Sequence, residues 1–218
     1  MNREELRAGF SKISTGDIAD AMVALGILPR TIIGLHAVKA NQEPTAGYAV
    51  TVQQMVRSVN KTENSLATHG TVIDTMLKSG DVLVVDVGGR MDVCTGGGLL
   101  ALRAKNLGVQ GFVINGCMRD LDDIAQSGCP VYLKGGCPIK SAPMLETVGV
   151  NVPVQIGETQ ICPGDLIVMD PTGIIVVPPA RAEEIYEMAL KIQRREDGRM
   201  DFVRYGGTVA GALAKVEL

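Results

Sequence analysis

The sequence contains no tryptophan and few other aromatic residues, with three Phe and four Tyr among 218 residues. Proteins that bind single-stranded nucleic acid use aromatic side chains for base stacking, so this scarcity counts against that class. Lys and Arg number 21 against 24 Asp and Glu, and the basic residues are spread along the chain. A partner that needs a basic patch, nucleic acid or an anionic membrane surface, is therefore not expected.

Long apolar runs are also missing. No stretch approaches the roughly 20 apolar residues that a bilayer span needs. The first ten residues, MNREELRAGF, are polar and amphipathic and lack the apolar core of a secretory signal. With 46% hydrophobic and 21% charged residues, the composition is typical of a globular chain. We expect a cytoplasmic protein whose residues 1–218 form a single domain.

Cysteine and histidine give little support for a metal or disulfide framework. The five cysteines are an odd number and form no CxxC pair, so neither disulfides nor a structural zinc site is expected. Most of them should be small buried apolar side chains. Two histidines, His36 and His69, are too few and too far apart for a histidine-based metal site. We expect His69 to be a packed or surface residue.

The middle of the chain alternates between two hydrophobic patterns. Continuous apolar runs bounded by turn residues predict strands at 80–89, 109–116 and 129–136, and helical spacing predicts helices at 99–108 and 119–128. Short loops join them. This alternation predicts parallel βαβ units in an α/β layer.

The flanking segments have other patterns. A helical segment at 1–26, a strand at 48–56 and a helix at 65–78 precede the alternating region. After it, residues 150–179 carry strands separated by Gly and Pro turns, which favours an antiparallel meander. Residues 180–218 begin with a long amphipathic helix and end in a weakly patterned tail, a segment suited to packing on a neighbouring subunit. The fold class is therefore α/β, with a parallel portion and an antiparallel C-terminal portion.

Charged residues and glycines follow each predicted parallel strand. The strand exits are Asp86–Arg90, Asn115–Asp120 and Lys134–Cys137. Parallel sheets bind ligands outside the carboxyl ends of their strands. We expect a site at this edge of the sheet.

The stretch GCMRDLDDI (116–124) has two interpretations. Acids near the start of a helix stabilise its positive end, and Arg119 could pair with Asp123 four residues later. Alternatively, Asp120 holds a divalent cation, Asp123 supports it through water, and Arg119 offers a planar fork to a carboxylate. The residues alone leave both interpretations open.

A triple glycine, Thr95-Gly96-Gly97-Gly98-Leu99, precedes the predicted helix 99–108. Glycines let backbone amides approach an anion at a helix N-terminus, although such a run can also be a flexible turn. Together with Arg119, these amides could hold one carboxylate from two sides. A metal at Asp120 would then meet a neighbouring keto oxygen, so a 2-oxo acid fits and C–C bond cleavage through an enolate becomes feasible.

These residues lie within a longer resemblance. The run GDVLVVDVGGRMDVCTGGGLLALRAKNLGVQGFVINGCMRDLDDI, the earlier ISTGDIADAMVALG, and the later VNVPVQIG, PGDLIVMD and TGIIVVP resemble the RraA-like family. That family includes class II 4-hydroxy-4-methyl-2-oxoglutarate aldolases and regulators of ribonuclease E activity. The resemblance covers roughly residues 10–200. Its most specific part is Gly98 followed, after twenty residues, by Arg119-Asp120 and then Asp123.

The resemblance implies a layered β/β/α swivelling-type fold in a homotrimer or a dimer of trimers, with active sites between subunits. It implies Mg²⁺ or Mn²⁺ on Asp120, water-mediated support from Asp123 and substrate contact by Arg119. The backbone of Gly96–Leu99 would bind the pyruvyl carboxylate, and Glu196 from a neighbouring subunit would approach the site. Residues 96–98 are all glycine where many relatives carry a polar residue, which leaves the proton donor to the enolate unassigned.

We therefore expect a metal-dependent lyase that cleaves a C–C bond of a 2-oxo acid through a pyruvate enolate, with oxaloacetate decarboxylation at the same site. Two alternatives stay open. Lys134, at a strand end, could act as a Schiff-base amine. A non-catalytic regulator that binds a ribonuclease or another protein is the alternative from a different class.

Overall fold

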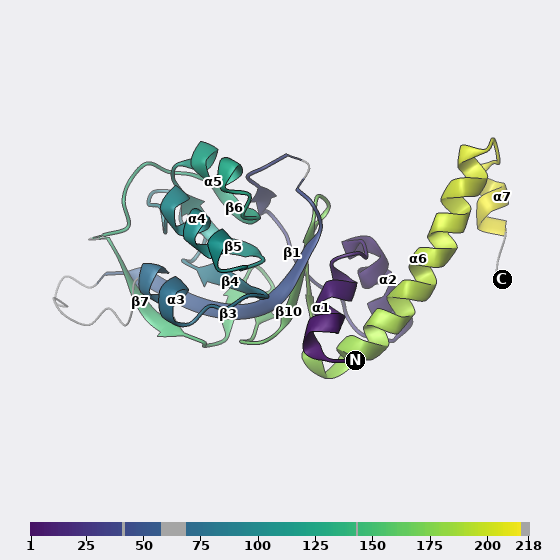
Figure 1. Cartoon of the computed structure of the whole chain (residues 1–218), viewed down its shortest axis with the longest axis horizontal. Coiled ribbons are helices and arrows are strands. Elements are labelled where there is room, and N and C mark those ends of the chain that lie inside the picture. The colour runs from purple at the N-terminus through teal and green to yellow at the C-terminus, as the bar shows by residue number, and fades with distance from the viewer. Residues whose placement is uncertain (41, 58–68, 143, 215–218) are drawn as a thin grey trace.

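The computed structural model describes residues 1–40, 42–57, 69–142 and 144–214. Figure 1 labels many of the elements. They are α1 (Arg3–Phe10), α2 (Thr15–Ala24), β1 (Arg30–Ile32), β2 (His36–Ala37), β3 (Thr45–Val56), α3 (His69–Thr75), β4 (Asp81–Asp86), α4 (Gly98–Asn106), β5 (Gly111–Met118), α5 (Leu121–Ser127), β6 (Val131–Gly136), β7 (Leu145–Val150), β8 (Val154–Ile156), β9 (Thr159–Ile161), β10 (Leu166–Asp170), β11 (Gly173–Val177), a 3₁₀ turn at Pro179–Arg181, α6 (Ala182–Arg204) and α7 (Val209–Ala214).

A nine-stranded mixed sheet forms the centre of the molecule. Its order is β1-β11-β10-β3-β4-β5-β6-β2, and β7 pairs with the second half of β3. Strands β3, β4, β5 and β6 are parallel to one another. The C-terminal strands β10 and β11 are antiparallel, as are β8 and β9, which form a separate hairpin. The predicted fold class, a parallel α/β core with an antiparallel C-terminal portion, is confirmed.

Two of the parallel strands, β4 and β5, are buried along their whole length. Every residue of β4 (DVLVVD) and of β5 (GFVINGCM) is buried. A strand covered on both faces reads as a continuous apolar run, which is the pattern that predicted these two elements. Their carboxyl ends, at Asp86 and Met118, therefore emerge from a rigid core.

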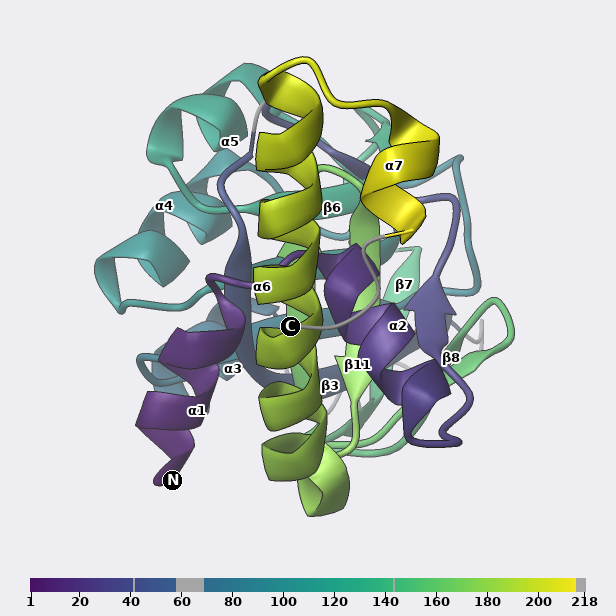
Figure 2. The same ribbon diagram turned by 90° about the vertical axis from the view of Figure 1, so that its right-hand side faces the viewer.

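Two groups of helices cover the sheet. Helices α3, α4 and α5 pack on the parallel strands around Ile73, Ala101 and Ile124. Helices α1, α2 and α6 lie together over the C-terminal strands, as Figure 2 shows, around Phe10 and Ile185. A third cluster fills the opposite face of the sheet, where the β8–β9 hairpin contacts both sets of strands.

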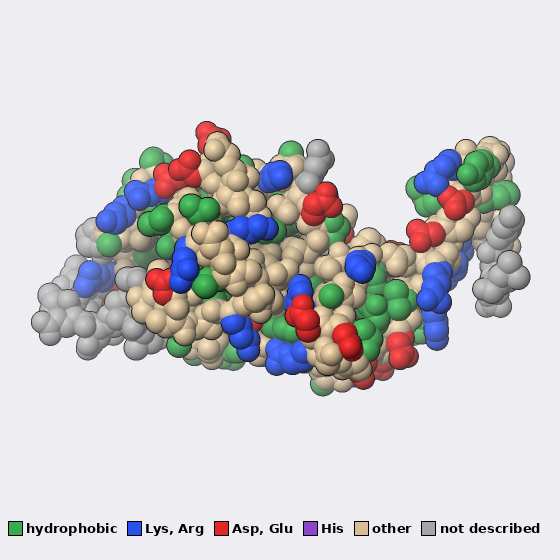
Figure 3. All heavy atoms as spheres, in the orientation of Figure 1, with side chains coloured by type: hydrophobic (Ala, Val, Ile, Leu, Met, Phe, Trp, Pro, Cys, Tyr) green, Lys and Arg blue, Asp and Glu red, His purple; other side chains and the backbone are tan. Residues whose placement is uncertain are grey.

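The C-terminal arm, residues 194–214, follows the last buried residue of α6, Ile192. Figure 1 shows the outer end of α6 and α7 standing apart from the body of the molecule. Figure 3 shows hydrophobic side chains at its tip. Its large exposed apolar residues are Met200, Val203, Tyr205, Val209 and Leu213. None of the described helices is long and apolar enough to cross a membrane.

Several helices and strands begin or end at other residues than the sequence predicted. The N-terminal helical segment consists of two helices, and the long C-terminal helix continues to Arg204. Helix α3 occupies His69–Thr75 of the predicted range 65–78, and residues 65–68 lie outside the described residues. Strands β1, β2 and β7 were not predicted. The first two span three and two residues, too few to show a period.

The Asp170-Pro-Thr-Gly173 turn is structural. The Asp170 carboxylate accepts hydrogen bonds from the backbone N–H groups of Thr172 (2.8 Å) and Gly173 (3.1 Å) inside the turn. It also accepts from Thr15, at 2.7 Å from the backbone nitrogen and 2.9 Å from Oγ1, at the first residue of α2. One buried carboxylate thus joins the β10–β11 turn to the N-terminus of α2.

Candidate active site

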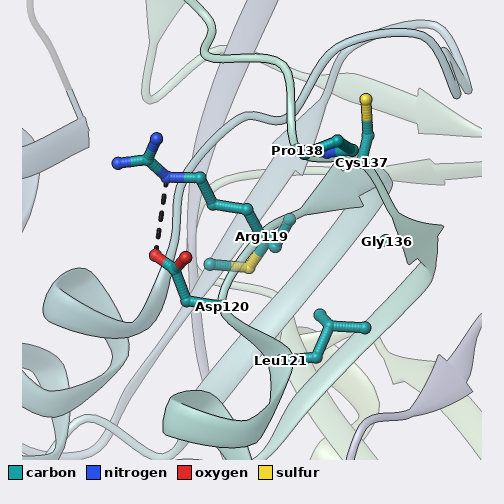
Figure 4. Close-up of a pocket in the computed structure, with 7 residues that line it drawn as sticks. Arg119, Asp120, Leu121, Gly136, Cys137 and Pro138 are labelled. Atoms are coloured by element: carbon teal, nitrogen blue, oxygen red, sulfur yellow. Dashed lines mark ion pairs between the residues drawn. The ribbon is translucent and has the colours of Figure 1, made fainter.

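A cavity of about 310 Å³ opens at the carboxyl ends of β5 and β6. Its lining residues are Met118, Arg119, Asp120, Leu121, Gly136, Cys137 and Pro138. Figure 4 shows the Arg119 and Asp120 side chains pointing toward each other at its edge. Two of the predicted site residues thus lie in the cavity, at the sheet edge where the strand exits were expected to converge.

Asp120 has an unusual backbone conformation. Its φ of 56° and ψ of 47° place it in the left-handed region, which non-glycine residues seldom adopt. It occupies the N-cap position of α5, yet its carboxylate makes no capping hydrogen bond. Oδ2 instead lies 3.4 Å from Nε of Arg119, and both side chains remain more than 40% exposed. This carboxylate is therefore free of the helix and available to a ligand.

The glycine loop (residues 96–98) lies directly behind these acids. A Cβ on Gly97 would lie 2.5 Å from Asp120 Oδ2, and a Cβ on Gly98 would lie 2.5 Å from Asp123 Cβ. Neither distance is possible for a real side chain, so only glycine fits at 97 and 98 without a shift. The structure therefore brings together the two motifs that the sequence separates by twenty residues.

The amides of the glycine loop are unoccupied. No acceptor for the backbone N–H groups of Gly96, Gly97, Gly98 or Leu99 is found within the described ranges, and Gly97 caps α4 without a side-chain bond. The loop itself is fixed, because the N–H of Arg119 donates to the carbonyl of Gly96 at 3.0 Å. Free amides at the start of a helix favour an anion.

The first interpretation of GCMRDLDDI, a helix start alone, accounts for part of the stretch. Asp122 and Asp123 lie in the first turn of α5, where acids stabilise the helix. Arg119, however, pairs with Asp120. The helix-start interpretation had paired it with Asp123. The Asp123 side chain packs over Gly98. Helix capping thus leaves the Arg119–Asp120 pair unexplained.

A divalent cation fits these residues in one way. No group of three or more His, Cys, Asp or Glu side chains suited to a metal occurs in the part of the chain that the structure describes. A site built on Asp120 would therefore use fewer than three such side chains from the described residues. Mg²⁺ accepts such a site because it keeps several waters and is completed by substrate oxygens. The partly exposed, uncapped Asp120 carboxylate meets that requirement.

Two other candidates lie away from the cavity. Glu196 is on the C-terminal arm and pairs with Arg199 at 2.6 Å and Arg195 at 3.2 Å. Lys134 is exposed, and its Nζ lies 2.8 Å from the position of a Cβ on Gly89. Neither side chain lines the cavity. Within one chain, the structure does not bring Glu196 to Asp120, and Lys134 lies outside the cavity lining.

The sequence did not identify the apolar part of the lining, Met118, Leu121, Cys137 and Pro138. Only the strand-exit argument pointed to this region. Beneath the cavity, Cys137 clusters with Cys94 and Cys117. All five cysteines are free and four are buried, as predicted. Burial raises the pKa of the Cys94 and Cys117 thiols, so both are protonated at neutral pH.

Residues 15–176 match the family model described as RraA-like, Aldolase/RraA. The chain therefore belongs to the RraA-like family. A Halalkalibacterium halodurans protein, provisionally named a 4-hydroxy-4-methyl-2-oxoglutarate aldolase, is 31% identical over 192 residues, covering 87% of this chain and 84% of the relative. An uncharacterized Methanocaldococcus jannaschii protein is 34% identical over 166 residues, covering 75% and 74%.

Solved structures agree with this assignment. An uncharacterized Pseudomonas syringae protein has a TM-score of 0.83 at 27% identity and covers 96% of each chain. RraAS2 of Streptomyces coelicolor, described as an unusual member of the RNase ES inhibitor RraA family, has a TM-score of 0.78 at 28% identity, covering 90% of this chain and 96% of that one. The family thus contains proteins named as aldolases and proteins named as ribonuclease inhibitors.

Proposed function

We propose that the chain is a divalent-metal-dependent lyase that cleaves a C–C bond of a 2-oxo acid and releases pyruvate. The observation that carries this proposal is the Arg119–Asp120 pair at the edge of the cavity, directly in front of a glycine loop with unoccupied amides. The Arg119 guanidinium, the Asp120 carboxylate and several backbone N–H donors lie in one place. Such a set suits a substrate that has both a carboxylate and a neighbouring carbonyl.

The chain's own groups have distinct roles in this proposal. The amides of Gly96–Leu99 and the guanidinium of Arg119 bind the substrate carboxylate from two sides. Arg119 also lies close enough to Asp120, 3.4 Å, to face the negative charge that develops on the keto oxygen. Donors that are already oriented toward a developing charge lower the barrier, because they need no reorganisation during the reaction.

Asp120 would hold Mg²⁺ or Mn²⁺, with Asp123 supporting it through water. A divalent cation supplies Lewis acidity at the keto oxygen. In the proposed reaction, the C3–C4 bond of a 4-hydroxy-2-oxo acid would break and its electron pair would enter the pyruvate enolate. Water would take the 4-hydroxyl proton as the new carbonyl forms. Protonation of the enolate carbon by water gives pyruvate. Oxaloacetate would lose carbon dioxide through the same enolate, so the proposal expects both activities at one site.

The proposal includes a homo-oligomer. The C-terminal arm extends from the body and exposes Met200, Tyr205, Val209 and Leu213 to solvent. An apolar surface of this kind is typical of a contact with another subunit. We propose that the arm packs on a second copy in a trimer or hexamer, and that Glu196 approaches the neighbouring copy's site.

The test is a pyruvate-release assay on the purified protein. The substrates are 4-hydroxy-4-methyl-2-oxoglutarate and oxaloacetate, each with Mg²⁺, with Mn²⁺ and after chelation. Release that requires the metal and disappears on chelation supports the proposal. No release from either substrate with either metal would overturn it.

A second candidate function is regulation of a ribonuclease or another protein. The similarity to RraAS2 favours it. The uncapped Asp120 carboxylate favours the lyase, because a protein-binding surface has no need for it. Capture of a ribonuclease by the purified protein, together with inactivity across 2-oxo acids, would decide for the regulator.

A further inference from the structure

The cavity at the carboxyl ends of β5 and β6 has a charged side and an apolar side. Among the described residues that line it, only Arg119 and Asp120 are charged. Figure 4 shows the charged groups of these two residues facing each other, with Leu121, Gly136 and Pro138 lying apart from them. Under the proposed function, both charged side chains serve the reacting end of the substrate, its carboxylate and keto group. The remaining part of the substrate then meets the uncharged lining.

The apolar side of the cavity is built by Leu121, Gly136 and Pro138. Leu121 is the first residue of α5 and packs in part on the core. A Cβ on Gly136 would lie 3.0 Å from Cδ1 of Leu121, so the leucine side chain borders the space that a side chain at 136 would fill. Pro138 has no backbone N–H, and the N–H of Cys137 already donates to the carbonyl of Met118 at 3.0 Å. The backbone of residues 137 and 138 therefore offers no free N–H to a ligand.

A second carboxylate on the substrate would be unfavourable at the apolar side. It would lose water on entering the cavity and would find neither a cation nor an N–H of residues 137 and 138 there. An alkyl group has the opposite balance, because each CH₂ that moves from water to an apolar surface improves binding roughly threefold. The cavity volume of about 310 Å³ is that of a site for a small molecule. A short alkyl group therefore suits this side of the cavity.

We propose that the substrate is a 4-hydroxy-2-oxo monocarboxylic acid with a short alkyl group at C4, and that Leu121 and Gly136 determine this preference. The inference rests on the proposed function and narrows its substrate class. Cleavage of the C3–C4 bond would give pyruvate and an aliphatic aldehyde. The electron pair of that bond would enter the enolate, water would take the 4-hydroxyl proton, and a proton from water would complete the methyl group of pyruvate.

Two substrates that differ in one group test this preference. 4-Hydroxy-2-oxohexanoate ends in a methyl group where 4-hydroxy-2-oxoadipate carries its second carboxylate, and the reacting atoms of the two are the same. We expect kcat/KM for the hexanoate, measured by metal-dependent release of pyruvate, to exceed that for the adipate at least about tenfold. The hexanoate should also exceed 4-hydroxy-2-oxopentanoate, which is one CH₂ shorter, by about threefold.

A cation at position 121 should shift the preference toward the dicarboxylate. Leu121 is only partly buried, so Leu121→Arg can place a guanidinium at the apolar side. We expect the hexanoate-to-adipate ratio of kcat/KM to fall at least about tenfold in this variant. The ratio compares two substrates in one protein, so an effect of the substitution on Asp120 acts on both substrates and cancels. Leu28→Arg, at a leucine that is 83% exposed and does not line the cavity, is the matched control and should leave the ratio unchanged.

A smaller change at Gly136 tests the space for the alkyl group. Gly136→Ala places a methyl group 3.0 Å from Cδ1 of Leu121 and takes up room on the apolar side. We expect it to lower kcat/KM for the hexanoate at least about threefold more than for the pentanoate, because the longer substituent needs more of this space.

The outcomes separate this inference from the proposed function. A wild-type kcat/KM for the adipate that equals or exceeds that for the hexanoate would overturn the inference and leave the lyase in place. It would indicate a cation at the apolar side, such as one from the arm of a neighbouring copy. An unchanged ratio in folded Leu121→Arg, together with no selective loss in Gly136→Ala, would also overturn it. Failure of the lyase has a different signature, because no pyruvate would be released from any of these substrates with either metal.

Discussion

A methyl group on Gly97 would lie 2.5 Å from Oδ2 of Asp120 and 3.1 Å from Cγ of Arg119. The backbone of residue 97 is thus the surface on which the two charged side chains of the cavity rest. Gly97 has an extended backbone, with φ of −160°, so its role is one of space and not of conformation.

We expect Gly97→Ala to reduce kcat/KM at least about a hundredfold, because the Asp120 carboxylate and Arg119 must both move and misplacement of reacting groups is costly. The folded state should lose little, since both side chains are partly exposed and can shift into solvent. Gly173→Ala is the matched control, with no atom within 4 Å of its added methyl group. Steady-state kinetics and thermal unfolding of both variants check this. Full activity in Gly97→Ala would contradict the placement of the site.

Asp120→Asn should abolish metal-dependent release of pyruvate. Asparagine has nearly the same shape and tolerates the left-handed conformation, but it lacks the charge that a hard divalent cation prefers. The proposed oligomer and the melting temperature should be unchanged. Asp122→Asn, two residues away in the first turn of α5, is the control and should retain activity. Equal activity in the two variants would show that Asp120 does not hold the metal.

Acid should destabilise the protein through His69. Because burial lowers the pKa of His69 from 6.5 to about 4, the unfolded chain binds a proton in this interval that the folded chain does not. Stability is therefore lost as the pH falls from 6.5 toward 4, by up to roughly 3 kcal/mol for this group. Urea unfolding at about pH 7 and about pH 4.5 should show a smaller loss in His69→Gln than in the wild type. Equal losses would show that other groups dominate.

Asp170→Ala should destabilise the fold without touching the site. It removes the acceptor for both donors of Thr15 and for the N–H groups of Thr172 and Gly173. Buried donors left without a partner cost about 1–3 kcal/mol each before relaxation, so we expect a total loss of roughly 3–5 kcal/mol in urea unfolding. Asp20→Ala, on the exposed side of α2, should change stability by less than about 0.5 kcal/mol. The activity of the remaining folded Asp170→Ala protein should be normal.

The parallel core could be predicted because its physics is local to each segment. Strands β4 and β5 are continuous apolar runs, and the loops between elements are short, so both the strand direction and the shared edge followed. The same reasoning placed Arg119 and Asp120 at that edge. Strand β7 was not predicted, because its pairing with the second half of β3 is a long-range contact that leaves no periodic signal in six residues.

The details of the site could not be predicted for another reason. The sequence RDLDD does not predict that Asp120 adopts a left-handed conformation. It also does not predict that Arg119 pairs with Asp120 in preference to Asp123. Gly97 and Gly98, which lie directly against Asp120 and Asp123, come from a part of the chain about twenty residues earlier. The burial of His69 is equally nonlocal, because the sequence alone left open whether this residue is packed or on the surface.

The left-handed backbone at residue 120 makes the folded state less stable at a residue that the proposed function requires. Glycine would adopt this conformation at no steric cost, so Asp120→Gly should make the folded chain more stable by roughly 1 kcal/mol. A selection for heat resistance alone would favour that replacement and would remove the carboxylate. Under the proposed function, the aspartate at position 120 lowers the stability of the fold and supplies the carboxylate that binds the metal.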